Sequence, residues 1–278
     1  MDVLGKMDNC YSVLMSVYVR EKAERLRSAM NSIWEQTVST DDFVLVCDGP
    51  LNAELNDVIC EMQREHDALR VIRLDRNKGL GNALNIGIKE CRHELVARMD
   101  SDDISRPERC ERQLRVFLEH PEISICSGTV EEFETSIEEI EARRVLPETH
   151  EDIVEFAKKR NPFNHPCVMY KKSAVEMSGG YQEYHLLEDY YLWIRMILKG
   201  CIGYNIQDPL LWMRAGSDMY KRRSGWKYVQ SQRRLMSYMK KTGFINRRQF
   251  VLGGTKRTIV ALLPNCIRSI LYKKLLRK

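Results

Sequence analysis

Short apolar segments alternate with segments of helical periodicity over the first hundred residues of the chain. The apolar segments are Ser12–Tyr18, Phe43–Cys47, Leu69–Leu74 and Glu94–Arg98. The first two are nearly continuous apolar runs, which is typical of strands buried on both faces of a sheet, and Leu95-Val96-Ala97 gives the fourth a shorter apolar run. The intervening segments repeat apolar residues at helical spacing, as at Leu26, Met30 and Ile33. This alternation predicts stacked βα units, and therefore an α/β fold with a mostly parallel sheet flanked by helices.

Polar side chains stand where these four strands end. Tyr18, Asp48, Asn77 and Asp100 lie at or just beyond the carboxyl ends of the predicted strands. In open α/β sheets, ligands bind outside the carboxyl ends of the strands. The sequence therefore predicts one ligand site at this edge, built from four separate loops.

The segment Met99–Asp103 contains three carboxylates within four residues, on Asp100, Asp102 and Asp103. Carboxylates at a buried strand end are costly unless positive charge neutralises them. One interpretation is a divalent cation held by hard oxygen ligands. The other is that they are ordinary loop and cap residues, because a helix is predicted to begin near Pro107. These residues alone leave both interpretations open.

The pattern of helices and strands continues beyond the acidic segment. The next predicted elements are the helix Pro107–Glu119, the strand Ile123–Gly128, the acid-rich segment Glu131–Arg144, the helix Glu151–Lys159 and the strand Cys167–Tyr170. The acid-rich segment is interpreted as a hairpin or an exposed excursion. A later helix begins with two acids, Glu188 and Asp189, in its first turn, where the helix dipole favours anions.

Composition limits the classes of protein that remain. A chain of 278 residues with 44% hydrophobic and 30% charged residues can form one large α/β domain or two small ones. Its nine cysteines are scattered, and none form a C-x-x-C pair, which favours reduced structural thiols over disulfides or zinc. Neither a signal-peptide core nor an uninterrupted apolar run of membrane-spanning length is found. A cytoplasmic location is therefore expected.

Charge divides the chain into two parts. Residues 214–278 carry 18 basic residues and one acid, a net +17, whereas the preceding 213 residues carry a net −12. We therefore expect a domain at residues 1–214 and a basic, amphipathic helical extension at residues 215–278. Such an extension predicts association with an anionic membrane surface. Nucleic acid is not expected, because the aromatic residues are not interleaved with the basic ones as a base-stacking platform needs.

The chain resembles glycosyltransferase family 2, whose members are inverting enzymes of the GT-A fold that use nucleotide-activated sugars. The resemblance is carried by the strand Ser12–Tyr18, the turn Asp48-Gly49, the loop from Asn77 to Gly87, the D-x-D motif Asp100-Ser101-Asp102 and the pair Glu188-Asp189 before Trp193. Asn164-His165-Pro166 with Gly179-Gly180-Tyr181 is similar to the branch that builds bacterial capsule, exopolysaccharide or O-antigen. One departure is Val19-Arg20, where many relatives carry asparagine, and it bears on the preference for the base.

The resemblance implies a donor site. Its residues are Tyr18, Asp48, Asn77, Lys78 and Asp100, with Arg222 and Arg223 from a basic loop. Asp48 would accept a hydrogen bond from an imide N–H, as in uracil, although aspartate before glycine also forms turns. The two arginines would close on the diphosphate. Simple solvated charge is their alternative interpretation.

The resemblance also implies a metal and an acceptor site. Asp102 would hold Mn²⁺ or Mg²⁺, with Asp100 facing the ribose or the metal and Asp103 capping a helix or supporting these ligands. His165 would complete the metal shell or hold the acceptor, with a structural imidazole as an equal alternative.

The implied general base is Asp189, which would take the acceptor proton. Glu188 and Trp193 are the implied acceptor contacts. Charge that complements the helix dipole is the alternative for the two acids, and core packing is the alternative for Trp193.

The implied activity is metal-dependent, inverting transfer of a hexose from a nucleotide sugar, UDP-linked by preference, to a hydroxyl of a lipid-linked or saccharide acceptor in surface polysaccharide assembly. One alternative is a nucleotidyltransferase that makes sugar nucleotides, for which Gly5-Lys6 is too little of a Gly-rich signature. The other is a non-enzymatic domain with a membrane- or nucleic-acid-binding tail. That alternative predicts that Asp102→Asn and Asp189→Asn leave function intact.

Overall fold

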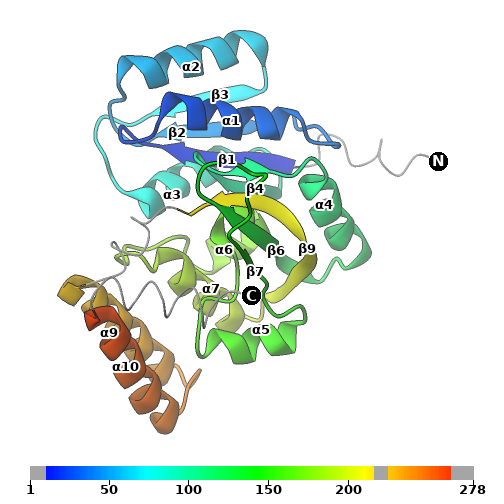
Figure 1. Ribbon diagram of the computed structural model, residues 1–278. Helices are drawn as coiled ribbons and strands as arrows, with labels where there is room; N and C mark the ends of the chain where they lie inside the picture. Colours follow the sequence, from blue (N-terminus) through cyan, green and yellow to red (C-terminus); the bar gives the residue numbers. More distant parts are fainter. Residues whose placement is uncertain (1–10, 216–224, 264–278) are drawn as a thin grey trace.

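The computed structural model describes residues 11–215 and 225–263, and the strands, all within residues 11–214, form one nine-stranded sheet. Its strands are β1 (Tyr11–Val17), β2 (Phe43–Cys47), β3 (Leu69–Arg73), β4 (Leu95–Asp100), β5 (Ile104–Ser105), β6 (Ile123–Phe133), β7 (Ala142–Arg144), β8 (Met169–Lys171) and β9 (Ile202–Arg214). Their order is β3-β2-β1-β4-β8-β6-β9-β5, and β7 pairs with β6 (Figure 1). The predicted α/β class is therefore confirmed.

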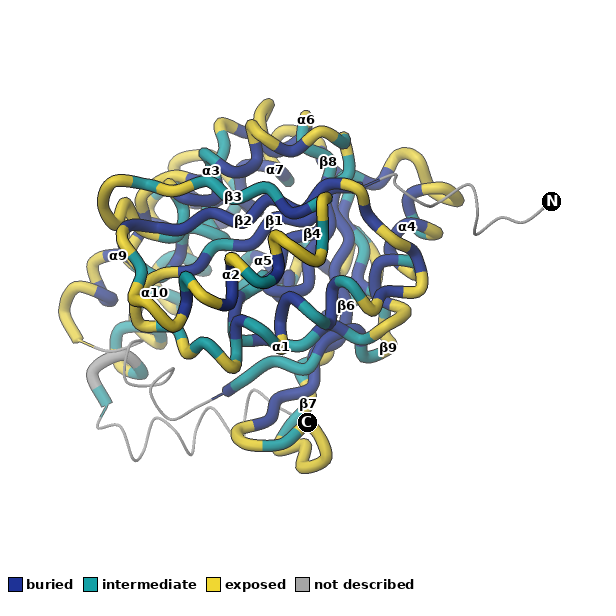
Figure 2. The backbone as a smooth tube through the Cα atoms, turned by 90° about the horizontal axis from the view of Figure 1, so that it is seen from above, coloured by how far each residue is buried: buried dark blue, intermediate teal, exposed yellow. Residues whose placement is uncertain are grey.

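The described helices include those that cover both faces of the sheet and a pair, late in the chain, that packs on one of them. They are α1 (Ala23–Trp34), α2 (Ala53–Glu65), α3 (Leu80–Glu90), α4 (Arg109–Glu119), α5 (His150–Ala157), the 3-10 helix η2 (His165–Cys167), α6 (Lys172–Met177), α7 (Glu188–Leu198), α9 (Gly225–Lys241) and α10 (Arg247–Leu262). Successive strand residues point to opposite faces. Val13 of β1 therefore packs in one core with α1, α2 and α4, and Leu14 packs in a second core with α3, α6 and α7. Figure 2 shows β1 and β2 buried along their lengths.

The parallel part of the sheet consists of β3, β2, β1 and β4, as predicted. Leu14 of β1 lies opposite Val44 of β2 and Arg98 of β4, and β2 pairs with β3 in the same sense. The carboxyl ends of these strands therefore meet at one edge. The loops after β1, β2 and β4 consequently start side by side.

The second part of the sheet is mixed. β8 runs antiparallel to both β4 and β6, whereas β6 and β9 are parallel. The sequence pattern misses β9, because Gln207, Asp208 and Pro209 interrupt its apolar character. The pairing of β6 with β9 shifts register beside Pro209, a residue that lacks the N–H needed for a ladder hydrogen bond.

The acid-rich segment after β6 is a hairpin, because β7 returns antiparallel to β6. The alternative of an exposed excursion is wrong for its first residues. Glu131 and Glu132 are buried within β6. The Glu131 carboxylate forms salt bridges with Arg106 and Arg143. Burial of Glu131 is possible because the two arginines neutralise its charge. Cys167, the first residue of the predicted strand Cys167–Tyr170, instead ends the 3-10 helix η2, and β8 begins at Met169.

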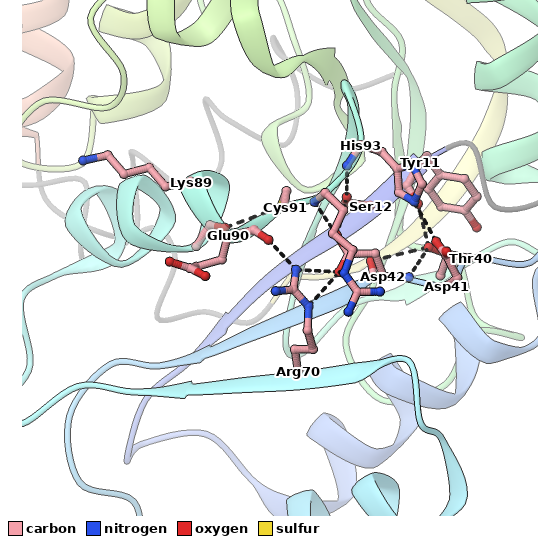
Figure 3. Close-up of polar contacts among 12 residues, drawn as sticks. Tyr11, Ser12, Thr40, Asp41, Asp42, Arg70, Lys89, Glu90, Cys91 and His93 are labelled. Atoms are coloured by element: carbon pink, nitrogen blue, oxygen red, sulfur yellow. Dashed lines mark hydrogen bonds and ion pairs between the residues drawn. The ribbon is translucent and has the colours of Figure 1, made fainter.

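A buried carboxylate joins the amino ends of the parallel strands (Figure 3). Asp42 is fully buried and accepts hydrogen bonds from Ser12 Oγ at 2.6 Å, Arg70 Nε at 2.9 Å and the Arg92 backbone N–H at 2.7 Å. Burial alone would raise its pKa, but the hydrogen bonds from Arg92, Ser12 and Arg70 hold the pKa of Asp42 below its usual value. The network ties β1, β2, β3 and the end of α3 together.

The helices α9 and α10 form a hairpin that packs on α7. Val229, Leu235 and Met239 of α9 share a core cluster with Tyr190 and Ile194 of α7. Figure 1 draws the two helices, in orange to red, beyond the layer of α7. Among the described helices, none has the length and apolar character needed to span a membrane.

The close approach of α3 to the sheet provides a test of the fold. A Cβ added at Gly87 would lie 2.7 Å from Val46 Cγ2 and would collide with Leu14. We expect Gly87→Ala to lower the free energy of unfolding by about 1–3 kcal/mol through overpacking, measured by thermal or urea denaturation. Gly254→Ala in α10 is the matched control, because its Cβ would meet nothing within 4 Å. Equal stabilities of the two variants would contradict this packing.

Candidate active site

The loops after β2 and before α3 are joined through Asp48, which is buried. Its Oδ1 accepts a hydrogen bond from the Lys78 N–H at 2.6 Å, and its Oδ2 accepts one from the Gly79 N–H at 3.0 Å. The Asn77 side chain donates to the Asp48 backbone carbonyl at 3.2 Å. The structure thus brings Asp48, Asn77 and Lys78 together as expected. Each carboxylate oxygen keeps a second lone pair, so the proposed contact with a base stays possible and stays a prediction.

Two glycines allow the loop after β2 and the loop before α3 to lie close together. Gly49 has φ +94°, and a Cβ there would lie 2.7 Å from the Asn77 backbone nitrogen. Gly79, at the amino end of α3, has φ +84°. Both values fall in the left-handed region that favours glycine.

The loop after β1 reaches the acidic cluster through Glu21. The Glu21 N–H donates to the carbonyl of Tyr18, whose side chain is exposed, and Glu21 Oε2 accepts from Ser101 Oγ at 3.0 Å. Glu21 therefore connects the residues after β1 with those after β4. Its carboxylate also adds a negative charge to the surroundings of Asp102.

A buried arginine neutralises Asp100 at the end of β4. Arg98 has only 1% of its surface exposed, and its guanidinium forks onto Asp100, with Nη1 at 2.9 Å from Oδ2 and Nη2 on Oδ1. Side chains two apart on a strand point to the same face, which permits this pair. Bidentate pairing of this kind is the strongest form of arginine–carboxylate contact.

Within the described residues, Asp102 and Asp103 have no such arginine pair. Burial and the charges of Asp100 and Glu21 raise the pKa of Asp102 to about 7. Burial and the charges of Asp102 and Asp100 raise the pKa of Asp103 well above its usual value. The prediction that Asp103 caps a helix is wrong. Its Oδ1 instead accepts the backbone N–H of Arg214 at 2.7 Å, and α4 begins only at Arg109.

The second pair of acids opens α7. Asp189 Oδ1 accepts the Tyr190 N–H at 2.7 Å, and Asp189 Oδ2 accepts Asn161 Nδ2 at 2.6 Å. Burial, followed by the charge of Asp189, raises the pKa of Glu188 to about 7, while Arg98 lowers it. A Cβ added at Gly81 of α3 would lie 3.7 Å from Glu188 Cβ. The amino ends of α3 and α7 therefore meet beside the loops of the sheet edge.

His165 and Trp193 occupy the interior beneath these acids. His165 Nε2 lies 3.0 Å from Tyr181 Oη, and burial together with the charge of Arg98 holds the pKa of His165 well below its usual value. The imidazole is therefore neutral and engaged with tyrosine. Trp193 is fully buried, edge-on to Phe163 with ring centroids 5.8 Å apart. The expected acceptor contact of Trp193 is replaced by a role in the core, because no face of the indole is exposed.

Two predicted arginines cannot be placed, and four residues that were not predicted contact the candidate site. Arg222 and Arg223 lie outside the described residues. Sequence reasoning missed Arg98, Glu21, Asn161 and Arg214. Only Arg98 left a signal, since it is a charge inside an apolar strand two residues before Asp100.

The acidic cluster is suited to a divalent cation that takes only one or two ligands from the protein. Burial and the charges of Asp100 and Glu21 disfavour the ionised form of Asp102, and a cation would relieve this repulsion. No group of three or more potential ligands occurs within residues 11–215 and 225–263. Mg²⁺ characteristically uses one or two carboxylates and completes its shell with substrate phosphates and water. Asp102 is the side chain best suited to such a site, since Asp100 is already paired with Arg98.

Solved structures share this arrangement of sheet and helices. The crystal structure of S. aureus TarS residues 1–349 in complex with UDP is 16% identical, with a TM-score of 0.60 over 95% of this chain and 86% of that chain. The mannosyltransferase PcManGT from Pyrobaculum calidifontis, in complex with GDP-Man and Mn²⁺, is 14% identical, with a TM-score of 0.64 over 90% of this chain and 69% of that chain. The fold is therefore that of the GT-A class of glycosyltransferases.

Sequence comparisons give the family. Residues 12–177 match the family described as Glycosyl transferase family 2. The amylovoran biosynthesis glycosyltransferase AmsE of Erwinia amylovora is 40% identical over 95% of this chain and 98% of its own length. The UDP-Gal:alpha-D-GlcNAc-diphosphoundecaprenol beta-1,3-galactosyltransferase of Escherichia coli is 37% identical over 96% of this chain and 97% of its own length. The chain belongs to glycosyltransferase family 2, as the resemblance predicted.

The partly buried Glu188 makes stability depend on pH. The unfolded chain loses this proton near pH 4.3, but the folded protein keeps it up to about pH 7. The folded state therefore binds more protons in this window, and its stability falls as the pH rises through it. We expect Glu188→Gln to raise the free energy of unfolding by about 1–2 kcal/mol at pH 8 and by much less at pH 5.

Thermal unfolding at the two pH values measures this difference. Glu183→Gln is the matched control, because Glu183 is exposed. An equal gain for Glu188→Gln at pH 5 and pH 8 would contradict the assignment.

Proposed function

We propose that the protein transfers a hexose from a nucleotide sugar, preferably UDP-linked, to a hydroxyl group of a lipid-linked saccharide in surface polysaccharide biosynthesis. The observation that carries the proposal is the pair of carboxylate sites on either side of Arg98, one after β4 and one at the start of α7. The relatives whose names describe amylovoran biosynthesis and a diphosphoundecaprenol acceptor support the substrate class.

The acidic cluster serves the donor. Asp102 would hold Mn²⁺ or Mg²⁺, with Asp100 oriented by Arg98 beside it. A bound divalent cation supplies charge that stabilises the diphosphate leaving group. His165 is a further candidate for this shell through its Nδ1, because its Nε2 engages Tyr181.

The nucleotide end of the donor lies at the neighbouring loops in this proposal. Asp48 accepts an imide N–H of the base, and Tyr18, Asn77 and Lys78 line the same edge of the sheet. The argument for Asp48 is that its backbone donors leave it with free lone pairs. Arg222 and Arg223 remain candidates for contacts with the diphosphate.

Asp189 acts as the general base. Its carboxylate takes the proton of the acceptor hydroxyl while that oxygen bonds to the anomeric carbon. The bond from this carbon to the diphosphate breaks at the same time, and its electron pair leaves with the nucleoside diphosphate. Attack opposite the leaving group inverts the anomeric centre. Glu188, beside the base, is available to hydrogen-bond an acceptor or sugar hydroxyl.

Release of nucleoside diphosphate tests the reaction. We expect UDP release from one member of a panel of UDP-sugars, dependent on Mn²⁺ or Mg²⁺ and abolished by EDTA. Asp102→Asn and Asp189→Asn should each lower turnover roughly 100-fold or more, because each removes charge needed at the reacting centre. Asp208→Asn, at an exposed aspartate on β9, should change little.

Turnover that persists in EDTA would refute the proposed requirement for Mn²⁺ or Mg²⁺. Absence of turnover with every donor would refute the transferase activity. Release of pyrophosphate in place of UDP would indicate a nucleotidyltransferase.

The helical hairpin α9–α10 is the proposed contact with the membrane that carries the acceptor. Residues 225–263 contain nine basic residues and no acid. The exposed residues of α10 are Arg247, Arg248, Val251, Leu252, Thr255, Lys256 and Ile259. Aliphatic side chains among cations, with no acid, match an anionic bilayer surface.

Flotation with vesicles tests this contact in the full-length protein. Val251→Ser/Leu252→Ser and Arg247→Gln/Arg248→Gln should each lower binding to vesicles of anionic lipid roughly tenfold, with little effect on folding. Leu118→Ser/Met177→Ser is the matched control, because both residues are exposed elsewhere. Binding that is unchanged in the α10 variants, or equal with zwitterionic vesicles, would contradict the proposal.

A further inference from the structure

The side-chain amide of Asn161 is aimed at the proposed base by its own surroundings. Asn161 Nδ2 donates to Asp189 Oδ2 at 2.6 Å, and Asn161 Oδ1 accepts the backbone N–H of Phe163 at 3.4 Å. Reversing the amide would set its oxygen against the carboxylate and its NH₂ group against an N–H. Both reversed contacts would be repulsive, so the surroundings define a single orientation.

The turn that carries Asn161 is fixed against the same helix as Asp189. Phe163, one per cent exposed, packs edge-on to Trp193 with an interplanar angle of 78°. Trp193 follows Asp189 by four residues on α7, so the turn contacts α7 at two points about one helical turn apart. Pro162 lies between Asn161 and Phe163 in the chain, and its carbonyl accepts a hydrogen bond from Asn205 Nδ2 of β9 at 3.1 Å. The turn therefore cannot move without disturbing the core.

The first turn of α7 is held from the other side as well. Tyr190, the neighbour of Asp189, donates its hydroxyl to the Ala157 carbonyl at the end of α5. Arg257 of α10 donates to Tyr190 Oη at 3.1 Å and to the Lys159 carbonyl at 2.8 Å. The end of α5, the turn and the start of α7 thus form one connected unit.

We propose that Asn161 is a positioning residue for the general base, an inference that rests on the proposed role of Asp189. The Tyr190 N–H holds one carboxylate oxygen and Asn161 holds the other, so the plane of the carboxylate is fixed. Each oxygen keeps a lone pair for the acceptor proton. Loss of the Asn161 contact frees the carboxylate to rotate, with the neighbouring Glu188 repelling it. Misorientation of a base lowers the rate of the chemical step and leaves donor binding intact.

Asn161→Asp separates this role from a structural one. The substitution preserves size and the oxygen that accepts the Phe163 N–H, but it replaces the donor with an acceptor. We expect kcat for UDP release in the presence of acceptor to fall roughly tenfold or more, with the KM for the UDP-sugar within twofold of wild type. Some loss of Tm is expected as well, because the new carboxylate faces Asp189. Asn161→Ala should also lose kcat. Asn56→Asp in α2, which also adds a carboxylate but lies far from α7, is the matched control.

A structural role alone would give near wild-type kcat for Asn161→Asp, because the turn is preserved. That result would overturn the inference. A fall in kcat accompanied by an equal rise in KM would also overturn it.

A double-mutant cycle with Asp189→Asn completes the test. If Asn161 acts through Asp189, adding Asn161→Asp to Asp189→Asn causes no further loss, whereas independent roles give multiplicative losses. An inactive Asp189→Asn with a fully active Asn161→Asp would refute the positioning role and leave the base intact. A fully active Asp189→Asn would refute the base assignment, and the positioning role with it.

Discussion

A buried ion pair at the end of the central strand supports the rest of the site. Arg98 is almost completely enclosed, and an unpaired guanidinium there would cost several kcal/mol. Asp100 supplies the neutralising charge, and Arg98 in turn allows acids to gather around the end of β4. The same cation partly offsets the rise that burial and Asp189 cause in the pKa of Glu188, and it adds to the larger effect of burial that lowers the pKa of His165. One arginine thus couples the electrostatics of the acids after β4 with those at the start of α7.

Buried carboxyl groups at the two ends of the parallel strands have pKa values shifted in opposite directions. At the amino ends, Asp42 is fully paired and its pKa is held low, so it contributes to stability. At the carboxyl ends, Asp102 and Asp103 are incompletely neutralised and their pKa values are raised. Negative charge that is not neutralised is unfavourable in the free protein, and a bound cation or a hydrogen-bonding substrate would relieve it. Perturbed carboxylates of this kind mark functional sites.

The sequence predicted some elements closely and missed others for physical reasons. The strands β1 to β4 were found within about two residues, because β1, β2 and β4 are mostly buried and leave apolar runs, and Leu69, Val71 and Ile72 mark β3. β9 was missed, because half of it is polar and Pro209 interrupts its ladder. Asp103 was misassigned as a helix cap, since its actual partner, the Arg214 N–H, is 111 residues away in the chain.

The sequence by itself determined the α/β class, the family and the loops that hold the candidate acids, since these follow from local patterns and short motifs. Only the tertiary structure decided what each acid contacts. It assigned Arg98 to Asp100, Asn161 to Asp189 and Trp193 to the core. Such assignments depend on which segments, distant in sequence, pack together and on how much water their packing excludes. Burial and pairing set the charge of a carboxyl group, and neither is encoded in its immediate neighbours.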